Sequence, residues 1–297
     1  MTDRAEKPLK ILISGQHGQV SQALQKSLAD LGELVVLGRD QLDLNDPLAV
    51  IDRVQAVQPD LIINAAAYTA VDQAETDATA AFQINAMSAG VFAQQAEELG
   101  IPLVHYSTDY VFDGSKQSPY TEEDEPKPLG VYGASKLTGE QAISAIGGQH
   151  LILRTSWVYS TVGRNFLLTM QRLLQERDEL NVVADQIGAP TWAGTIAQST
   201  RQLIERWRSG NPGVWGTYHL TASGETSWFG FAEAIGQELI KNGKKCATLH
   251  PIPSSAYPTP APRPLNSRLD CSRLQSEWGV QQTDWHSALL QCLSEQR

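Results

Sequence analysis

The amino-acid sequence predicts an α/β fold, in which a doubly wound parallel sheet of the Rossmann type is joined to a smaller C-terminal substrate-binding unit. Between residues 10 and 155, short apolar runs alternate with segments of helical periodicity, which is typical of βαβ units. The apolar runs are continuous and do not alternate with polar residues, as expected for strands that helices cover on both faces. A glycine-containing turn directly follows the first run, at the place where sheets of this kind bind dinucleotides.

The elements of the first half follow one another in a regular order. Strands are expected in the runs LKILIS (9–14), LVVLG (34–38), DLIINAA (60–66), LVHYSTD (103–109) and LILRTS (151–156). Helices are expected over 20–32, over PLAVIDRVQAV (47–57), in the long alanine-rich segment between residues 66 and 103, and from VYGASKLTGE (131–140) onward. Residues 1–157 are therefore predicted to form the dinucleotide-binding Rossmann domain.

The second half has a looser rhythm, and the boundary between the two parts stays open. Residues 158–297 are predicted to be mainly the substrate-binding region, although segments around 164–210 are expected to return in part to the first domain. These segments are a helix over about 165–177, a strand at 180–184 and an amphipathic helix at 195–207. The smaller unit is assigned a strand at 216–220, a helix at 228–243 and a proline-dense run at 250–264. Such a run is either a rigid solvated linker or, with three arginines close by, a loop that lines a cleft.

Composition and charge argue against several classes of protein. With 41% hydrophobic and 19% charged residues, the 297-residue chain is typical of a globular protein with a sizeable core. The net charge of −10 and the scattered Lys and Arg residues argue against a nucleic-acid surface. The apolar runs are too short to span a membrane, and the first residues lack the apolar core of a signal peptide, so we predict a cytoplasmic protein. Three cysteines without CxxC spacing are best explained as buried thiols.

The stretch GQHGQV after the first strand is predicted to bind the pyrophosphate of a dinucleotide. Gly15 and Gly18 lie where the strand turns into a helix, and a turn without side chains lets phosphates approach the N–H groups of the helix N-terminus. Gln19 and Val20 open that helix and are included in the predicted site, while Ser21 replaces the third glycine of the usual motif. An ordinary tight turn is the alternative, because a glycine pair alone is weak evidence.

The end of the second strand is predicted to influence which nicotinamide cofactor is used. An acidic residue at this place normally binds the ribose hydroxyls of NADH, but Gly38 and Arg39 stand there instead. A guanidinium group can pair with the 2′-phosphate of NADPH. The cofactor is therefore predicted to be NADPH or NADH, with NADPH used at least as well. The alternative is that Arg39 is a solvated loop residue.

Two further segments are predicted to contact the cofactor because they lie at or just beyond the carboxyl ends of strands. Asp43 and Leu44 can reach the edge of the adenine, although the DLND stretch also has the composition of a helix cap. The third strand ends in three small residues that let a flat cofactor lie close to the sheet, namely Ala65, Ala66 and Ala67. Tight packing between sheet and helix is the alternative explanation for these alanines.

The stretch YGASK places a phenol and an ammonium group on one face of a predicted helix. Tyr132 and Lys136 are four residues apart, so their side chains project toward the same volume. A nearby positive charge stabilises the phenolate and lowers the tyrosine pKa from its usual value of about 10, which suits proton transfer. The fourth strand ends in Ser107 and Thr108, whose hydroxyls can hydrogen-bond a substrate carbonyl. Each motif alone also occurs on ordinary helices and strand ends, so the prediction of catalysis depends on their combination.

The ordered set of a glycine turn, a small-residue strand end, a Ser/Thr strand end and a YxxxK helix resembles the extended short-chain dehydrogenase/reductase superfamily. Within it, the chain is similar to the dTDP-4-dehydrorhamnose reductase family over roughly residues 10 to 295, in segments that include NAAAYTAVDQAE, HYSTDYVFDG, VYGASKLTGE, LRTSWVY, QIGAPT and SAYPTPAPRPLNSRL. The resemblance implies that hydride from NAD(P)H reduces a 4-keto sugar nucleotide. It also implies that Thr108 holds the C4 carbonyl oxygen, that Tyr132 delivers the proton, and that Lys136 binds the nicotinamide ribose and lowers the tyrosine pKa.

The resemblance further implies a binding site for a dTDP-sugar substrate. Asp109 and Trp157 are expected to contact the sugar nucleotide, and Trp157 offers a flat face at the end of the fifth strand. Asn165 is expected to contact the nucleotide phosphates, with a helix N-cap as the alternative. Arg263 and Ser267 are expected to contact the diphosphate or the substrate, with loop scaffolding as the alternative.

Two positions depart from the pattern of the family. Some members bind Mg²⁺ between subunits through carboxylates, but this chain has Ala23 and Gly194 at the corresponding places. Neither side chain supplies an oxygen ligand, so we expect no metal site. Without the metal, a monomer or a weak homodimer is the expected state of assembly.

Two other functions remain open at this point. One is a non-catalytic regulatory subunit that keeps the fold and the cofactor, like the regulatory subunit of methionine adenosyltransferase, but the presence of Thr108, Tyr132 and Lys136 favours an enzyme. The other is a reductase, epimerase or dehydratase of a different nucleotide sugar. Dehydratases of the superfamily usually carry a carboxylate pair after the Ser/Thr, whereas here a single Asp109 is followed by Tyr110, which favours simple reduction.

Overall fold

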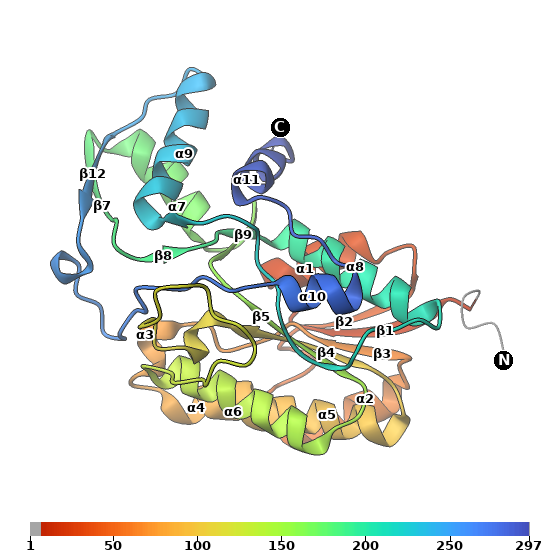
Figure 1. The fold of residues 1–297 in the computed structure, drawn as a ribbon. Coiled ribbons are helices and arrows are strands. Elements are labelled where there is room, and N and C mark those ends of the chain that lie inside the picture. Colours follow the sequence, from red (N-terminus) through yellow and green to blue (C-terminus); the bar gives the residue numbers. More distant parts are fainter. Residues whose placement is uncertain (1–6, 297) are drawn as a thin grey trace.

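A six-stranded parallel sheet forms the centre of the structure (Figure 1). The computed structural model describes residues 7–296. From one edge to the other, the strands are β10 (Gly216–His219), β5 (His150–Thr155), β4 (Leu103–Thr108), β3 (Leu61–Asn64), β1 (Leu9–Ser14) and β2 (Gly32–Leu37). Each strand runs parallel to its neighbours. The carboxyl ends of all six strands therefore share one edge of the sheet, which is where open α/β folds bind their ligands.

Helices cover both faces of this sheet, and the predicted doubly wound fold is confirmed. In Figure 1, one face carries α1 (Gln19–Ser27), α8 (Ala193–Arg208) and α10 (Ser272–Trp278), and the other carries α2 (Pro47–Val57), α5 (Ser88–Leu99) and α6 (Val131–Ile146). The alanine-rich segment before α5 is divided into α3 (Val71–Ala74), α4 (Ala78–Phe82) and the π-helical turn η1 (Gln83–Met87). A 3-10 turn, η2 (Asp109–Val111), follows β4.

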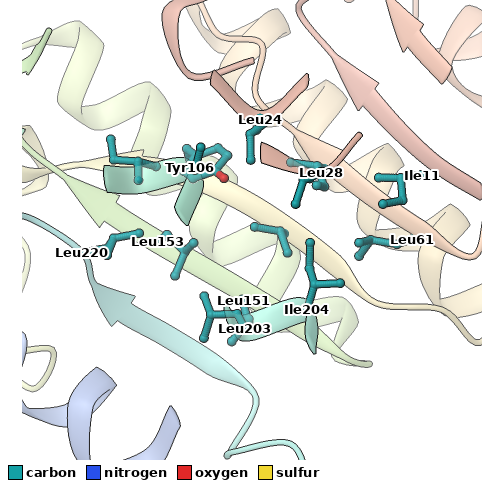
Figure 2. Close-up of a cluster of buried hydrophobic side chains, with 14 of the residues drawn as sticks. Ile11, Leu24, Leu28, Leu61, Tyr106, Leu151, Leu153, Leu203, Ile204 and Leu220 are labelled. Carbon is teal, nitrogen blue, oxygen red and sulfur yellow. The ribbon is translucent and has the colours of Figure 1, made fainter. Parts of the chain in front are cut away.

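The continuous apolar strands are explained by burial on both sides. Ile11 and Ile13 of β1 pack in one cluster with Leu24 and Leu28 of α1 and with side chains of α8 (Figure 2). Leu12, which points to the opposite face, packs in a second cluster with side chains of α2 and α5. All five side chains are fully buried. Since consecutive residues of a strand face opposite sides, the central positions of β1, from Ile11 to Ile13, all need apolar side chains.

A smaller unit packs around its own apolar cluster. It contains α7 (Phe166–Glu176), α9 (Trp228–Lys241), α11 (Trp285–Ser294) and the parallel pair β7 (Glu179–Val183) and β12 (Thr248–Ile252). Two shorter pairs join β6 (Val158–Tyr159) to β9 (Thr191–Trp192), and β8 (Ile187–Gly188) to β11 (Thr226–Ser227). The core of the unit includes Leu167, Met170, Leu174, Phe231, Ile235 and Leu289.

Several late segments lie elsewhere than the sequence suggests. The predicted strand at 216–220 was assigned to the smaller unit, but β10 forms the edge of the main sheet and pairs with β5. Of the segments expected to return in part to the first domain, α8 packs on α1, whereas α7 and β7 belong to the cluster of the smaller unit. The strand β12 was missed because it overlaps the proline-dense run. Proline is tolerated there because β12 is an edge strand with a single neighbour.

The rest of the proline-dense run does not form an isolated linker, because the segment that follows it is bridged to β8 and to the loop after β4. After the 3-10 turn η3 (Ser254–Ala256), isolated bridges pair Asn266 with Ile187 and Leu269 with Tyr120. These bridges hold the segment near the carboxyl edge of the sheet, between the two units. None of the helices within residues 7–296 is long and apolar enough to cross a membrane.

Candidate functional site

A groove of about 950 Å³ runs along the carboxyl ends of β1, β2, β3 and β4 and reaches the start of α6. Its volume is in the range expected for a cofactor site. The sequence-predicted cofactor residues all line it, namely Gly15, Gly18, Gln19, Val20, Arg39, Asp43, Leu44, Ala65, Ala66, Ala67, Tyr132 and Lys136. The fold therefore brings to one place residues that are spread over more than a hundred positions of the chain.

The turn between β1 and α1 has the backbone shape that phosphate binding requires. Gly15 has a φ of +87°, and a Cβ atom on it would lie 3.0 Å from the Cα atom of Ala66. Only glycine fits both the left-handed backbone and the close approach of β3. Gly18 is the N-cap of α1, and no side chain caps this helix end. The first N–H groups of α1 are therefore left for an anionic ligand, as the pyrophosphate of a nicotinamide dinucleotide would be.

The segment after β2 places a positively charged and a negatively charged side chain beside the groove. Arg39 and Asp40 are exposed and line it together. Asp43 also lines the groove, and its Oδ1 atom accepts hydrogen bonds from the backbone and side-chain nitrogens of Asn45 at 2.9 and 3.0 Å. The helix cap in the DLND stretch is supplied by Asp46, whose side chain accepts the N–H of Leu48. The helix cap considered as the alternative role for the DLND stretch is thus provided by Asp46. Asp43 stays available to a ligand.

A buried chain of hydrogen bonds links side chains of β1, β3 and β4 to Lys136. The Oγ atom of Ser14 donates to Asn64 Oδ1 at 2.7 Å, and the Asn64 amide contacts His105 Nδ1 at 3.0 Å. The Lys136 Nζ atom lies 3.1 Å from His105 Nε2 and donates to the carbonyl oxygen of Tyr106 at 2.6 Å. Burial lowers the pKa of Lys136 to about 8. Burial and the Lys136 charge hold the pKa of His105 well below its usual value, so this imidazole is neutral.

Tyr132 lies in the first turn of α6, and a residue directly after the distant helix α3 fixes that turn. The N-cap of α6 is Gly130, which has no side chain, and Glu75 Oε1 accepts the N–H of Val131 at 2.8 Å in its place. The ring of Tyr110 packs edge-on against Tyr132, with ring centres 5.6 Å apart. Burial raises the pKa of the Tyr132 phenol above its usual value, and the hydrogen-bonding influence of the nearby Thr108 hydroxyl opposes that rise only in part.

The expected lowering of the Tyr132 pKa by Lys136 is therefore not found in this structure. The ammonium group of Lys136 is turned toward His105 and the Tyr106 carbonyl, while the Tyr132 phenol is largely shielded from water. Desolvation disfavours the charged phenolate, and here it outweighs the other influences. A phenol that stays protonated at neutral pH still carries the proton that a general acid must deliver.

Three residues that are predicted to bind the substrate lie together beside Tyr132, namely Thr108, Asp109 and Ser267. Thr108 Oγ1 donates to Asp109 Oδ1 at 3.1 Å, and the Ser267 hydroxyl lies beside the same carboxyl group. Asp109 is 3% exposed, and its Oδ2 atom has no hydrogen-bond partner within the described part of the chain. Burial raises the pKa of Asp109 to about 6. An unpartnered buried oxygen of this kind is suited to accept a hydrogen bond from a ligand hydroxyl.

Arg263 joins the same cluster through Tyr110. Its guanidinium group lies over the Tyr110 ring at 5.8 Å and forms an ion pair of 2.8 Å with Asp72 of α3. The predicted scaffolding role describes these contacts, because the pair ties the proline-dense loop to α3. One guanidinium nitrogen, Nη1, is buried without a partner among the described residues and remains available to a ligand.

Trp157 lies at the end of β5 and stacks on a second tryptophan that the sequence analysis did not single out. Its ring is parallel to that of Trp228, at the start of α9, with centres 3.6 Å apart. The backbone of Trp157 has a φ of +47°, which is uncommon for a residue with a side chain. A Cβ atom on Gly188 would lie 2.7 Å from the indole ring, so glycine there makes room for the stack. The pair links the main sheet to the smaller unit.

Asn165 is the N-cap of α7, the alternative that the sequence had left open. Its Oδ1 atom accepts the N–H of Leu168 at 3.0 Å. Its amide nitrogen donates to Gln19 Oε1 at 2.7 Å, and to the carbonyl oxygens of Ser160 and Val162. Since these bonds use the hydrogen-bonding capacity of the amide, Asn165 acts on the groove by holding Gln19.

Some residues of the site were missed by reasoning from sequence. Arg164 lines the groove from the loop before α7, and its position next to Asn165, which is predicted to contact phosphate, could have indicated a role in the site. His105 contacts Lys136, and a histidine within an apolar strand is a weaker sequence indication of such a role. Glu75 caps α6 across 56 positions of the chain, and no local pattern predicts such a contact.

The two positions that depart from the metal-binding pattern lie at one small cavity of about 220 Å³. Ala23 and Gly194 line it together with Glu295, which is the only acidic side chain among the described lining residues. A Cβ atom on Gly194 would clash with the Trp192 ring. Within residues 7–296, no group of three or more potential metal-ligating side chains occurs. The donors present here do not make up the oxygen-rich shell that Mg²⁺ prefers.

Comparison with known proteins gives one consistent family. Residues 9–297 match the family model described as RmlD substrate binding domain. The chain is 46% identical to a dTDP-4-dehydrorhamnose reductase of Burkholderia thailandensis, covering 97% of this chain and 99% of that one. It is 44% identical to the reductase of the same name from Escherichia coli K12, covering 97% and 98%. Among solved structures, a dTDP-4-dehydrorhamnose reductase of Bacillus anthracis in complex with NADP is 34% identical, with a TM-score of 0.89 and coverage of 97% and 100%.

Proposed function

The chain belongs to the dTDP-4-dehydrorhamnose reductase family, and we propose on this basis that it reduces the 4-keto group of dTDP-4-dehydro-L-rhamnose to give dTDP-L-rhamnose, with NADPH or NADH as hydride donor. The NADP complex of the Bacillus anthracis relative supports the choice of cofactor. The observation that carries the proposal is that Tyr132 and Lys136 line the same groove as the glycine turn. A proton donor and a dinucleotide site then meet at one place.

The groove residues suit a nicotinamide dinucleotide. The N-terminus of α1 and the glycine turn would hold the pyrophosphate, and Arg39 would face the ribose that carries the 2′-phosphate in NADPH. Lys136 would hold the nicotinamide ribose. When bound, the reduced nicotinamide supplies hydride for the C4 carbon of the sugar.

Residues of the chain would supply the proton for the reaction and hold the C4 carbonyl oxygen in place. The Thr108 hydroxyl would fix the C4 carbonyl oxygen, and Tyr132 would donate its phenolic proton to that oxygen as negative charge develops there. Lys136, whose pKa of about 8 keeps it mostly charged at neutral pH, would stabilise the phenolate that remains. The carbonyl oxygen of Tyr106 would keep the ammonium in place by accepting its hydrogen bond.

Substitution of Tyr132 tests the central step. Tyr132→Phe is expected to lower kcat by about 10²–10⁴-fold, since it removes the general acid, while NADPH binding measured by fluorescence titration stays near that of the wild type. Tyr159→Phe is a matched control, because that buried hydroxyl has no hydrogen-bond partner within the described residues. Near wild-type turnover by Tyr132→Phe would remove the assigned role.

Lys136 is assigned two roles, and both can be measured. Lys136→Met is expected to weaken NADPH binding as well as to lower kcat. Unchanged cofactor affinity in this variant would leave Lys136 with the electrostatic role alone.

The smaller unit is proposed to bind the dTDP-sugar, with Trp157 and Trp228 offering an aromatic face. The cytoplasmic location and the monomeric or weakly dimeric state stay predictions.

A further inference from the structure

The hydroxyl group of Thr108 has one hydrogen and more than one acceptor for it. Its Oγ1 atom accepts the N–H of Tyr110 at 3.2 Å and donates to Asp109 Oδ1 at 3.1 Å. In the proposed reaction the same hydrogen must point to the C4 carbonyl oxygen of the substrate. A hydroxyl has one donor and two acceptor sites, so it cannot serve the Asp109 carboxylate and the ketone together.

The protonation state of Asp109 decides between these two arrangements. If Asp109 is ionised, it is an acceptor only and takes the Thr108 hydrogen, which leaves a lone pair of Thr108 facing the ketone. If Asp109 is protonated, its O–H donates to Thr108 Oγ1. The two acceptor sites of Oγ1 are then filled by Asp109 and the Tyr110 N–H, and its hydrogen is free for the ketone.

The surroundings of Asp109 shift its pKa toward neutral pH, because burial outweighs the hydrogen bonds that stabilise the carboxylate. The carboxyl group is 3% exposed, and one of its oxygens is buried without a partner among the described residues. The titratable groups that face it are the phenols of Tyr110 and Tyr132, both uncharged at neutral pH. Arg263 interacts with Tyr110 and is paired with Asp72 at 2.8 Å, so these two charges offset each other nearby. Burial raises the pKa of Asp109 to about 6, and a bound substrate would exclude more water.

We propose that Asp109 is a positioning residue that acts in its protonated form, by donating a hydrogen bond to Thr108 Oγ1 and so directing the Thr108 hydrogen to the substrate carbonyl. This inference rests on the proposed reductase function. It assigns to Asp109 a hydrogen-bond donor role that is distinct from the sugar contact expected from sequence. No proton is consumed in this step, because Asp109 keeps its proton while Tyr132 supplies the one that is transferred.

The consequence is a pH dependence with a defined sign. Asp109 is protonated below its pKa, so kcat/KM for the sugar is expected to be highest there and to fall about tenfold per pH unit above it. Deprotonation of Lys136, whose pKa is about 8 in this structure, adds a second fall at higher pH. The two effects are separable by substitution.

The test compares the pH profile of kcat/KM in wild type, Asp109→Asn and Asp113→Asn between about pH 5 and 9. The asparagine amide donates a hydrogen bond at every pH, so Asp109→Asn is expected to lose the fall near pH 6 and to keep the one near pH 8. The ratio of kcat/KM in Asp109→Asn to kcat/KM in the wild type is therefore expected to be higher at neutral pH than at acidic pH. Asp113, a neighbouring carboxylate bonded to Ser115 and Tyr120, is the matched control and should leave the wild-type profile unchanged.

Two outcomes would overturn the inference. One is an Asp109→Asn profile that keeps the fall near pH 6, and the other is a loss of kcat/KM by the same factor at every pH, as expected if Asp109 only accepts a sugar hydroxyl. Infrared difference spectra provide a second measurement, since a protonated Asp109 gives a carboxylic acid C=O band that Asp109→Asn lacks. If the wild type does not turn over the 4-keto sugar at all, the proposed function itself fails, and this result is distinct from either outcome.

Discussion

Glu140 forms the most deeply buried ion pair of the described chain, and its replacement is expected to destabilise the protein strongly. It lies on α6, four residues after Lys136, and its carboxylate binds Arg154 of β5 through contacts of 2.6 to 3.1 Å. The side chains of Arg154 and Glu140 are 6% and 4% exposed. Ser107 Oγ of β4 also donates to this carboxylate, at 2.5 Å. Helix α6, which carries Tyr132 and Lys136, is thus tied to two strands of the sheet by one charged group.

The magnitude follows from this burial. Removing one partner of a buried pair typically costs about 3–5 kcal/mol, because the remaining charge stays desolvated without compensation. Glu140→Gln keeps one oxygen that can accept from Arg154, so we expect the lower end, about 3 kcal/mol. For a protein of this length, about 2 °C of Tm is lost per kcal/mol, which gives a decrease of about 6 °C.

Thermal and urea unfolding measure this effect directly. Glu176→Gln is the matched control, because its pair with Arg172 is 52% exposed on the glutamate side and should contribute less than about 1 kcal/mol. A double variant, Glu140→Met with Arg154→Met, is expected to recover much of the loss, since apolar residues leave no buried charge. A decrease below about 1 kcal/mol in Glu140→Gln would refute the reasoning and show that Arg154 is hydrated.

The same variant has a predicted effect on catalysis. The charge of Glu140 raises the pKa of Lys136 and so works against the lowering by burial. Its removal is expected to lower that pKa further, so that the loss of activity at high pH begins at a lower pH than in the wild type. A high-pH limb that does not move would show that Glu140 acts on stability alone.

Two further predictions concern the cofactor and the metal. Arg39→Ala is expected to lower kcat/KM at least about tenfold for NADPH and little for NADH, because only NADPH carries the 2′-phosphate. Arg164 lines the same groove from the loop before α7, and Arg164→Ala is expected to weaken the binding of both cofactors through the pyrophosphate that they share. Equal loss with both cofactors in Arg39→Ala would contradict the assignment of Arg39. Activity is expected to survive dialysis against EDTA, because Ala23 and Gly194 offer no oxygen ligands, and a loss that Mg²⁺ restores would show that other carboxylates form a site.

The sequence by itself determined the sheet, the order of its elements and the dinucleotide groove. These features depend on local signals, namely continuous apolar runs, the glycine turn and residues that end strands, because parallel strands place their carboxyl ends at one edge. Residues as distant as Gly15 and Lys136 could be assigned to one site on that basis alone. The YxxxK spacing likewise placed Tyr132 and Lys136 on one helix face, since the α-helical repeat fixes it.

Only the tertiary structure decided which partners those residues meet. A strand pattern does not reveal which sheet it joins, so β10 and β12 were assigned to the wrong place or missed. The pKa of Tyr132 depends on desolvation by its surroundings, and these come from segments far away in the chain. The contact of Glu75 with α6 and the competition between Asp109 and a substrate for the Thr108 hydrogen arise in the same way. Burial and hydrogen-bond direction are properties of packing, and no periodicity in the sequence encodes them.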